Sequence, residues 1–313
     1  MIRQGVFGVL LGIAQALSTP NTEIPLSRLT ADATLTIALE PGATASDDAV
    51  WIPNGGAGTV VRVDAKDNRV HPAAAVGDPC ASLVVAFNSV WVPSCRESSL
   101  LRVVPADRKV SAKAAIGVAD PAGRIASGVG SIWVVSDRKG ILARIDPDTN
   151  QAVAEIHVAG GASSVLFASN SLWVTSGTGN RLTRINPHTN DIIEVIEVGR
   201  EPGPLAAADG AVWTLNRADG SITRVDAETN KVVATIAIGD EIADGDIAAG
   251  EGSVWISARA APLVRIDART NRVAQRFTGE PGGAVLVAHG SLWVAVGRQT
   301  WRLDPKLVAA MRP

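Results

Sequence analysis

The 313-residue sequence contains no tyrosine, four phenylalanines and two methionines. Because the chain is nonetheless 46% hydrophobic, its core must be filled by Val, Ile, Leu, Ala and eight tryptophans. β-Branched and aromatic residues fit the pleated surface of a sheet, so this composition favours strands. The net charge is only −2, and no overall basic field would attract nucleic acid or an anionic membrane. We therefore expect no nucleic-acid partner.

The N-terminal residues have the pattern of a secretory signal peptide. Arg3 supplies a positive charge, residues 6–17 are uncharged and mostly apolar, and an A-x-A cleavage pattern ends at Ala16. The apolar stretch is too short for a stable membrane span. We expect residues 1–16 to be a signal peptide, 17–31 to be an N-terminal segment, and the protein to be periplasmic or secreted. A first strand or a misplaced start codon is the alternative.

Tryptophan recurs along the chain at nearly even intervals. The differences between successive positions are 40, 42, 40, 40, 42 and 38 residues for Trp51, Trp91, Trp133, Trp173, Trp213, Trp255 and Trp293. A period of about 40 residues that holds several short strands is typical of a propeller blade. Residues 161–199 divide into four apolar runs separated by Gly, Asn, Ser and Pro turns.

The sequence therefore predicts an all-β, seven-bladed β-propeller with four antiparallel strands per blade. The propeller should occupy residues 32–304 and leave a C-terminal tail at 305–313. The seventh blade lacks a fourth strand of its own, and residues 33–39 copy the fourth-strand pattern of residues 233–239. We expect this N-terminal strand to close the last blade, because closure removes edges that invite aggregation.

Two repeated features look chemical but fit the repeat better as structure. Asp-rich segments at residues 146–150, 226–230 and 267–271 resemble calcium loops, yet they fall between third and fourth strands, where Asp, Pro and Asn form turns. An arginine also recurs on the third strand of every blade. We expect a structural hydrogen-bonding role for Arg62, Arg102, Arg144, Arg184, Arg224, Arg265 and Arg302.

Function is expected where loops depart from the repeat. The loops between blades, and those between second and third strands, gather on one face of a propeller, which we call the top face. Its inter-blade loops carry acids at Glu40, Asp78, Asp120, Glu201, Asp240 and Glu280. Its other loops carry a basic residue four or five positions after the tryptophan, at Arg96, Arg138, Arg217, Arg259 and Arg298. Arg124 and Asp246, near an insert at residues 242–245, break the small-residue pattern of the inner strands.

These residues predict a charged funnel that binds a small ligand or a protein partner. Mutual neutralisation of the acidic and basic residues is the alternative, and converging carboxylates could also hold a divalent cation. The four histidines should lie on outer strands or on the opposite, bottom face, and no GxSxG, phosphate-binding glycine loop or CxxC is present. We therefore assign no catalytic residue, metal ligand or cofactor.

Cys80 and Cys95 are predicted to form a disulfide. Both belong to the second blade, one entering its first strand and the other following its second strand, so both should reach the same top edge. Neighbouring antiparallel strands are ~4.5–5.5 Å apart, which a disulfide can bridge. Two isolated buried thiols are the alternative.

Family resemblance comes from the repeat. Trp173-Val174-Thr175-Ser176, with the Asp-Pro-x-Thr-Asn turn and the following Ile-x-Val-Gly, resembles the YVTN-type repeat. Over residues 32–304 the chain also resembles the virginiamycin B lyase (streptogramin lyase) group of seven-bladed propellers. Members of that group place histidine after proline in two top loops, where it holds magnesium and supplies the base. Gly203 and Gly282 stand at the matching positions here.

Because the histidines are missing, we expect an extracytoplasmic binding or scaffolding propeller rather than the group's lyase. A metal-dependent lyase or lactonase-like hydrolase with its site on the same top face is the alternative. We expect the protein to be a monomer.

Overall fold

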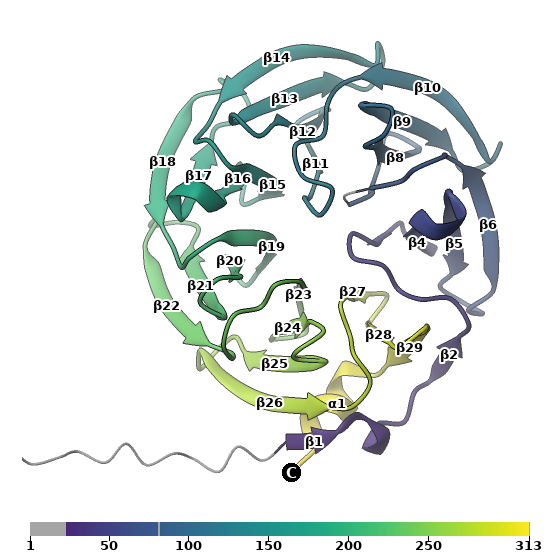
Figure 1. Cartoon of the computed structure of the whole chain (residues 1–313), viewed down its shortest axis with the longest axis vertical. Coiled ribbons are helices and arrows are strands. Elements are labelled where there is room, and N and C mark those ends of the chain that lie inside the picture. The colour runs from purple at the N-terminus through teal and green to yellow at the C-terminus, as the bar shows by residue number, and fades with distance from the viewer. Residues whose placement is uncertain (1–22, 81, 313) are drawn as a thin grey trace, which may run out of the picture.

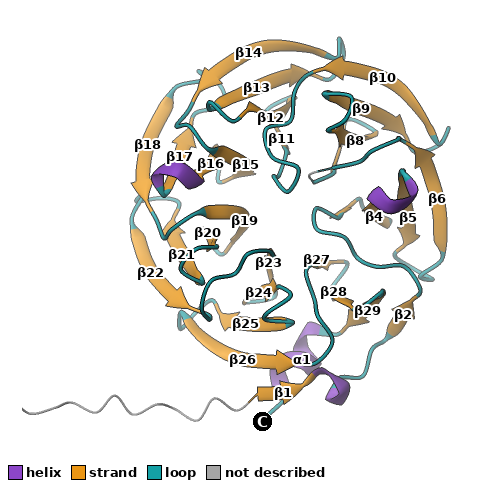
Figure 2. Ribbon diagram, in the orientation of Figure 1, coloured by secondary structure: helices purple, strands orange, loops and turns teal. Residues whose placement is uncertain are grey.

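The computed structural model describes residues 23–80 and 82–312, so the expected signal peptide lies outside the described residues. Seven sheets stand around a central axis and follow one another in chain order (Figure 1). In each sheet the first strand lies beside the axis and the last strand lies at the rim. The predicted seven-bladed propeller is confirmed, and almost all of the chain outside the strands is loop or turn (Figure 2).

The first four blades are built from consecutive strands. Blade one contains β3 (Thr44–Ala45), β4 (Ala49–Asn54), β5 (Thr59–Asp64) and β6 (Val70–Ala75). Blade two contains β7 (Val84–Ala86), β8 (Ser89–Ser94), β9 (Ser99–Val104) and β10 (Lys109–Ala115). Blade three contains β11 (Ala126–Gly128), β12 (Ser131–Asp137), β13 (Ile141–Asp146) and β14 (Gln151–His157). Blade four contains β15 (Ala162–Ala168), β16 (Ser171–Ser176), β17 (Arg181–Ile185) and β18 (Ile192–Glu197).

The last three blades include the additions made by the chain ends. Blade five contains β19 (Pro202–Ala208), β20 (Ala211–Asn216), β21 (Ser221–Asp226) and β22 (Val232–Ala237). Blade six contains β23 (Asp246–Gly250), β24 (Ser253–Ser257), β25 (Leu263–Asp267), β26 (Arg272–Thr278) and the extra β1 (Glu23–Pro25). Blade seven contains β27 (Val285–Ala288), β28 (Ser291–Val296), β29 (Gln299–Leu303) and β2 (Ala33–Leu35). Short 3-10 turns lie at Leu26–Arg28, Gly55–Ala57 and Gly177–Gly179, and α1 spans Pro305–Ala310.

The core lies between neighbouring blades. Every residue of β16 is buried, whereas five of the six residues of β18 at the rim are exposed. Trp173 of β16 packs against Leu205 and Val212 of blade five. The seven repeat tryptophans are at most 2% exposed, so each seam between blades has a large aromatic side chain at its centre.

The repeated arginines have the structural role that the sequence predicted. Each guanidinium lies 5.0–6.0 Å from the ring centroid of the tryptophan in its own blade. Arg184, for example, donates from Nε to Ser171 Oγ (2.9 Å) and from Nη1 to the backbone oxygen of Ala227 (2.7 Å). Nη1 also donates to Asn230 Oδ1 (2.7 Å), so the arginine reaches the bottom turn of the next blade.

We call this contact between an arginine and the next blade's bottom turn the inter-blade clamp. It is made by Arg102, Arg144, Arg184, Arg224 and Arg302, the last of which bonds Ala65 O of blade one. Arg62 instead bonds Asp48 (2.7 Å) and Asp64 (3.4 Å) within its own blade, and Arg265 bonds Ser253 and Gln275. Within residues 23–80 and 82–312, the seams between blades one and two and between blades six and seven therefore lack the clamp.

The Asp-rich segments are turns, as predicted. Asp146 Oδ1 accepts hydrogen bonds from the backbone N–H groups of Asp148 (2.8 Å) and Thr149 (3.0 Å), and Asn150 adopts a φ of 56°. The same backbone hydrogen bonds hold the pKa of Asp146 below its usual range.

The N-terminal strand closes the ring, as predicted, although it is shorter than the sequence pattern indicated. β2 pairs antiparallel with β29 over Ala33–Leu35 only. Beyond Leu35 the chain leaves the sheet, and the Thr300 hydroxyl donates to the backbone oxygen of Ile37 (2.6 Å).

The chain ends also cover blade six, which the sequence did not predict. β1 adds a fifth strand, parallel to β26, and its Ile24 is fully buried (Figure 1). Gln275 of β26 donates from Nε2 to the backbone oxygens of Val308 (2.9 Å) and Met311 (2.8 Å), which fixes α1 against the same blade. These contacts cover the rim strand of blade six, one of the two neighbours of the closing blade.

Candidate functional site

A cavity opens on the top face around the propeller axis. It has a volume of about 360 Å³ and is lined by loops of blades one, two, three, five, six and seven. Five prolines supply much of its apolar wall, at Pro41, Pro53, Pro79, Pro121 and Pro204. Cys80 also lines it, beside the confirmed disulfide to Cys95, whose Cα atoms are 5.9 Å apart. We call this space the axial cavity.

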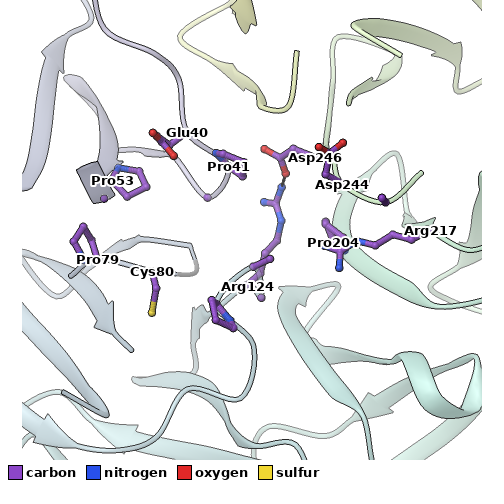
Figure 3. A pocket seen from close by; sticks show the side chains of 17 residues that line it. Glu40, Pro41, Pro53, Pro79, Cys80, Arg124, Pro204, Arg217, Asp244 and Asp246 are labelled. Carbon is purple, nitrogen blue, oxygen red and sulfur yellow. Dashed lines mark hydrogen bonds and ion pairs between the residues drawn. The ribbon is translucent and has the colours of Figure 1, made fainter. Parts of the chain in front are cut away.

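An ion pair spans the axial cavity. Arg124 extends from the loop before β11 and meets Asp246 at the start of β23, on the opposite side of the axis (Figure 3). Arg124 Nη2 also donates to the backbone oxygen of Ile247 (2.9 Å). The Asp246 side chain is only 5% exposed. The two residues that break the inner-strand pattern are therefore each other's partners.

Glu40 lies at the edge of the same cavity. The neighbouring loops partly desolvate its carboxyl group and raise its pKa above the usual range, although the residue as a whole is exposed to solvent. Asp244 lines the cavity too, and it pairs with the exposed Arg259 (N–O distance 3.3 Å). The insert at residues 242–245 thus forms part of the wall.

A second, more polar cavity lies beside the first, between blades three, four and five. We call it the lateral cavity, and its volume is about 500 Å³. Four predicted residues meet there: Asp120, Arg138, Glu201 and Arg217. Glu201 adopts a left-handed φ of 53°, and its backbone N–H donates to Asn180 Oδ1 (3.0 Å). Strained backbone of this kind clusters at functional sites.

Arg217 lines both cavities. It is the one partly buried member of the five predicted basic residues; the other four are exposed. The backbone N–H of Arg217 donates to Glu201 O (3.0 Å), and its backbone oxygen accepts from the Ile242 N–H (2.8 Å). Loops from two blades therefore fix its position.

The remaining predicted residues do not join this group. Asp78 accepts a hydrogen bond from the Arg96 backbone N–H (3.2 Å), and Asp240 lines a separate cavity between blades five and six. Glu280 and Arg298 line neither the axial nor the lateral cavity. The acids and bases therefore form no continuous ring. Among residues 23–80 and 82–312, none of the six predicted acids forms an ion pair with a predicted base, and Arg259 pairs with Asp244 of the insert instead.

The acids do not converge on one point. In the described part of the chain, no three His, Cys, Asp or Glu residues are placed so that they could share a metal ion. The positions that hold histidine in the resembled lyases are also closed. A Cβ on Gly203 would lie 3.0 Å from Arg217 Nε, and one on Gly282 would overlap Ser257 Oγ and the backbone oxygen of Pro262.

The fold is shared with proteins of known structure. A streptogramin B lyase superposes with a TM-score of 0.70 and 17% identity, covering 84% of this chain and 93% of the lyase. The chain is a seven-bladed β-propeller with the fold of streptogramin B lyase. This fold is the one implied by the YVTN-type and lyase resemblance, and at 17% identity the likeness concerns fold alone.

Two further structures show how widely the fold is used. The extracellular domain of a protein described as a one-component system from B. thetaiotaomicron has a TM-score of 0.67 and 15% identity, over 93% of this chain and 43% of that one. A chain of the mitotic checkpoint complex has a TM-score of 0.71 and 12% identity, over 96% and 99%. No family model and no curated protein matches the sequence.

The disulfide fits a location outside the cytoplasm, where such bonds persist. Among the residues that the structure describes, no helix has the length and apolar character of a membrane span.

Proposed function

We propose that this chain is a periplasmic or secreted binding protein that takes a small ligand into the axial cavity of its top face. The observation that carries the proposal is the cavity itself, which lies where the loops depart most from the repeat. Its volume of about 360 Å³ falls in the range of small-molecule sites. Its apolar proline wall and few charged groups also match the composition of such sites.

Rigidity supports the proposal. Proline fixes φ, and the disulfide joins the loop at Cys80 to the end of β8 at Cys95. A pocket that is already shaped before binding loses little conformational entropy when a ligand enters. The propeller therefore supplies a preformed site.

A hydrolase or lyase activity has less support than ligand binding. The matching histidine positions are Gly203 and Gly282, and neither has room for a larger side chain without displacing its neighbours. Burial raises the pKa of Glu40, but the axial cavity places no nucleophilic side chain beside it. A base without an adjacent nucleophile favours recognition over catalysis.

Filling the cavity tests the proposal. Ala122 is exposed and lines the axial cavity, so Ala122→Trp should occupy the space without disturbing the core. Ala106→Trp, in the exposed bottom turn between β9 and β10 of blade two, is the matched control. Ligand-observed NMR with a chemically mixed set of small compounds should find binders to the wild type. Binding should be lost in the Ala122 variant and kept in the Ala106 variant. Binders that persist in Ala122→Trp, or a wild type without binders, would overturn the proposal.

A further inference from the structure

The guanidinium of Arg217 is a charged group without a partner. Within residues 23–80 and 82–312 its side chain makes no ion pair, and its Nε is buried without a hydrogen-bond acceptor. The other arginines that line the two cavities do have partners: Arg124 pairs with Asp246, and Arg138 Nε donates to Ala119 O (2.9 Å). Partly burying a guanidinium that has five donors and no acceptor is unfavourable. A ligand that supplied the acceptors would remove that penalty.

Gly203 provides the space for this guanidinium. A Cβ at position 203 would lie 3.0 Å from Arg217 Nε and 3.1 Å from Cζ, and these are the nearest atoms that it would meet. The arginine therefore occupies the space above the glycine and projects toward Pro204, at the border of the axial cavity (Figure 3). The missing side chain at position 203 of β19 therefore leaves room for the cation.

The charges around Arg217 restrict the anion that it can accept. The axial cavity is lined by three acids and two arginines, namely Glu40, Asp244, Asp246, Arg124 and Arg217. The lateral cavity has two of each, namely Asp120, Glu201, Arg138 and Arg217. With no excess of positive charge, a multiply charged anion such as phosphate would be repelled by the acids. A monoanion is repelled less, because the repulsion scales with the charge of the ligand. The planar carboxylate also matches the fork of a guanidinium in a bidentate pair.

We propose that Arg217 is the carboxylate receptor of the site and that the ligand is a small apolar monocarboxylate. Its carboxylate pairs with the Arg217 guanidinium, and its hydrocarbon body lies against the proline wall of the axial cavity. This inference rests on the proposed function, since it names the ligand class and the residue that recognises it.

Titration calorimetry with three matched probes tests the proposal. The probes are 3-phenylpropionate, its alcohol 3-phenylpropan-1-ol and its amine 3-phenylpropylamine, with inorganic phosphate as a fourth. We expect only the carboxylate to bind the wild type. Arg217→Gln should weaken that binding about tenfold to a hundredfold, because a charge-assisted hydrogen-bonded pair is lost. Gly203→Ala keeps the charge but displaces the guanidinium, so it should weaken binding as well.

A matched control separates local from general charge effects. Arg298 lies in the corresponding loop of blade seven, is exposed and lines neither cavity, so Arg298→Gln should bind 3-phenylpropionate as the wild type does. Circular dichroism would establish that each variant is folded.

The outcomes distinguish this inference from the proposed function. If the alcohol or the amine binds and Ala122→Trp abolishes that binding, the axial cavity is a ligand site but the carboxylate assignment is wrong. If 3-phenylpropionate binds equally well to wild type and Arg217→Gln, or if phosphate binds better, the role of Arg217 is overturned. If none of the four probes binds, the carboxylate proposal fails, and the wider compound set decides whether the cavity binds anything.

Discussion

The inter-blade clamp predicts that chemically identical substitutions in different blades will have very different effects. Arg184→Ala removes three hydrogen bonds and the stacking on Trp173, and two of those bonds reach the turn of the next blade. At about 1 kcal/mol for each hydrogen bond and about 1 kcal/mol for stacking, the loss is about 4 kcal/mol of unfolding free energy.

Arg62→Ala should be far milder. Arg62 makes no clamp; its main partner is Asp48, whose side chain is 71% exposed, and it lies 6.0 Å from its tryptophan ring. An exposed ion pair contributes about 0.2–1 kcal/mol. We therefore expect the two variants to differ by about 3 kcal/mol.

Urea unfolding followed by tryptophan fluorescence measures this difference, because all seven repeat tryptophans are buried. With a slope of ~3 kcal/mol per molar urea, the two midpoints should lie about 1 M apart. Arg302→Ala, which removes another clamp, should behave like the Arg184 variant. Equal midpoints for Arg62→Ala and Arg184→Ala would show that contact with the next blade's turn does not stabilise the ring.

Three further predictions concern the top face. Replacing both Cys80 and Cys95 by Ala should lower the unfolding free energy by ~3 kcal/mol, as expected for a loop of 15 residues; free thiols at both positions in exported protein would refute the bond. Asp246→Ala leaves the Arg124 guanidinium without its carboxylate and should lower the unfolding free energy by about 3 kcal/mol. The variant with alanine at both Arg124 and Asp246 should lose less than the sum of the two single losses, and a double-mutant cycle without coupling would contradict this. Because burial raises the pKa of Glu40, protonation favours the folded state, and the resulting stability is present below pH ~4.5 and lost as pH rises. Glu40→Gln should thus raise the unfolding free energy at pH 7 and leave it unchanged below pH 4. An increase in stability that did not depend on pH would show that the raised pKa of Glu40 is not its cause.

Much of the fold could be predicted from the sequence because it repeats. The tryptophan period predicts seven blades. An arginine is present in every blade because in each one its guanidinium lies over the tryptophan of that blade. The disulfide was predictable because both cysteines belong to one blade, where register determines which residues lie side by side.

The additions made by the chain ends and the conformations of the top loops could not be predicted. β1 is three residues long, and no other blade has a strand in its place, so no pattern indicated that Glu23–Pro25 would join blade six. In the site, the even spacing of acids and bases predicted one charged funnel. Loop conformation instead gathered Asp120, Glu201 and Arg217 in one cavity and left Glu280 outside it. The one feature of the sequence that pointed to the axial cavity was the insert before Asp246, because its residues form part of the cavity wall.

Between blades one and two, the two faces of the propeller are held differently. On the top face the disulfide joins the entering loop at Cys80 to β8, while below it Arg62 makes no clamp and a cavity of about 700 Å³ separates the turns. Local opening requires least free energy where the fewest contacts must break. We therefore expect this seam to open from below, and the amides of residues 106–108 to exchange with solvent early. The loops around the axial cavity stay in place during such opening, so the shape that a ligand meets is insulated from the ring's most frequent motion.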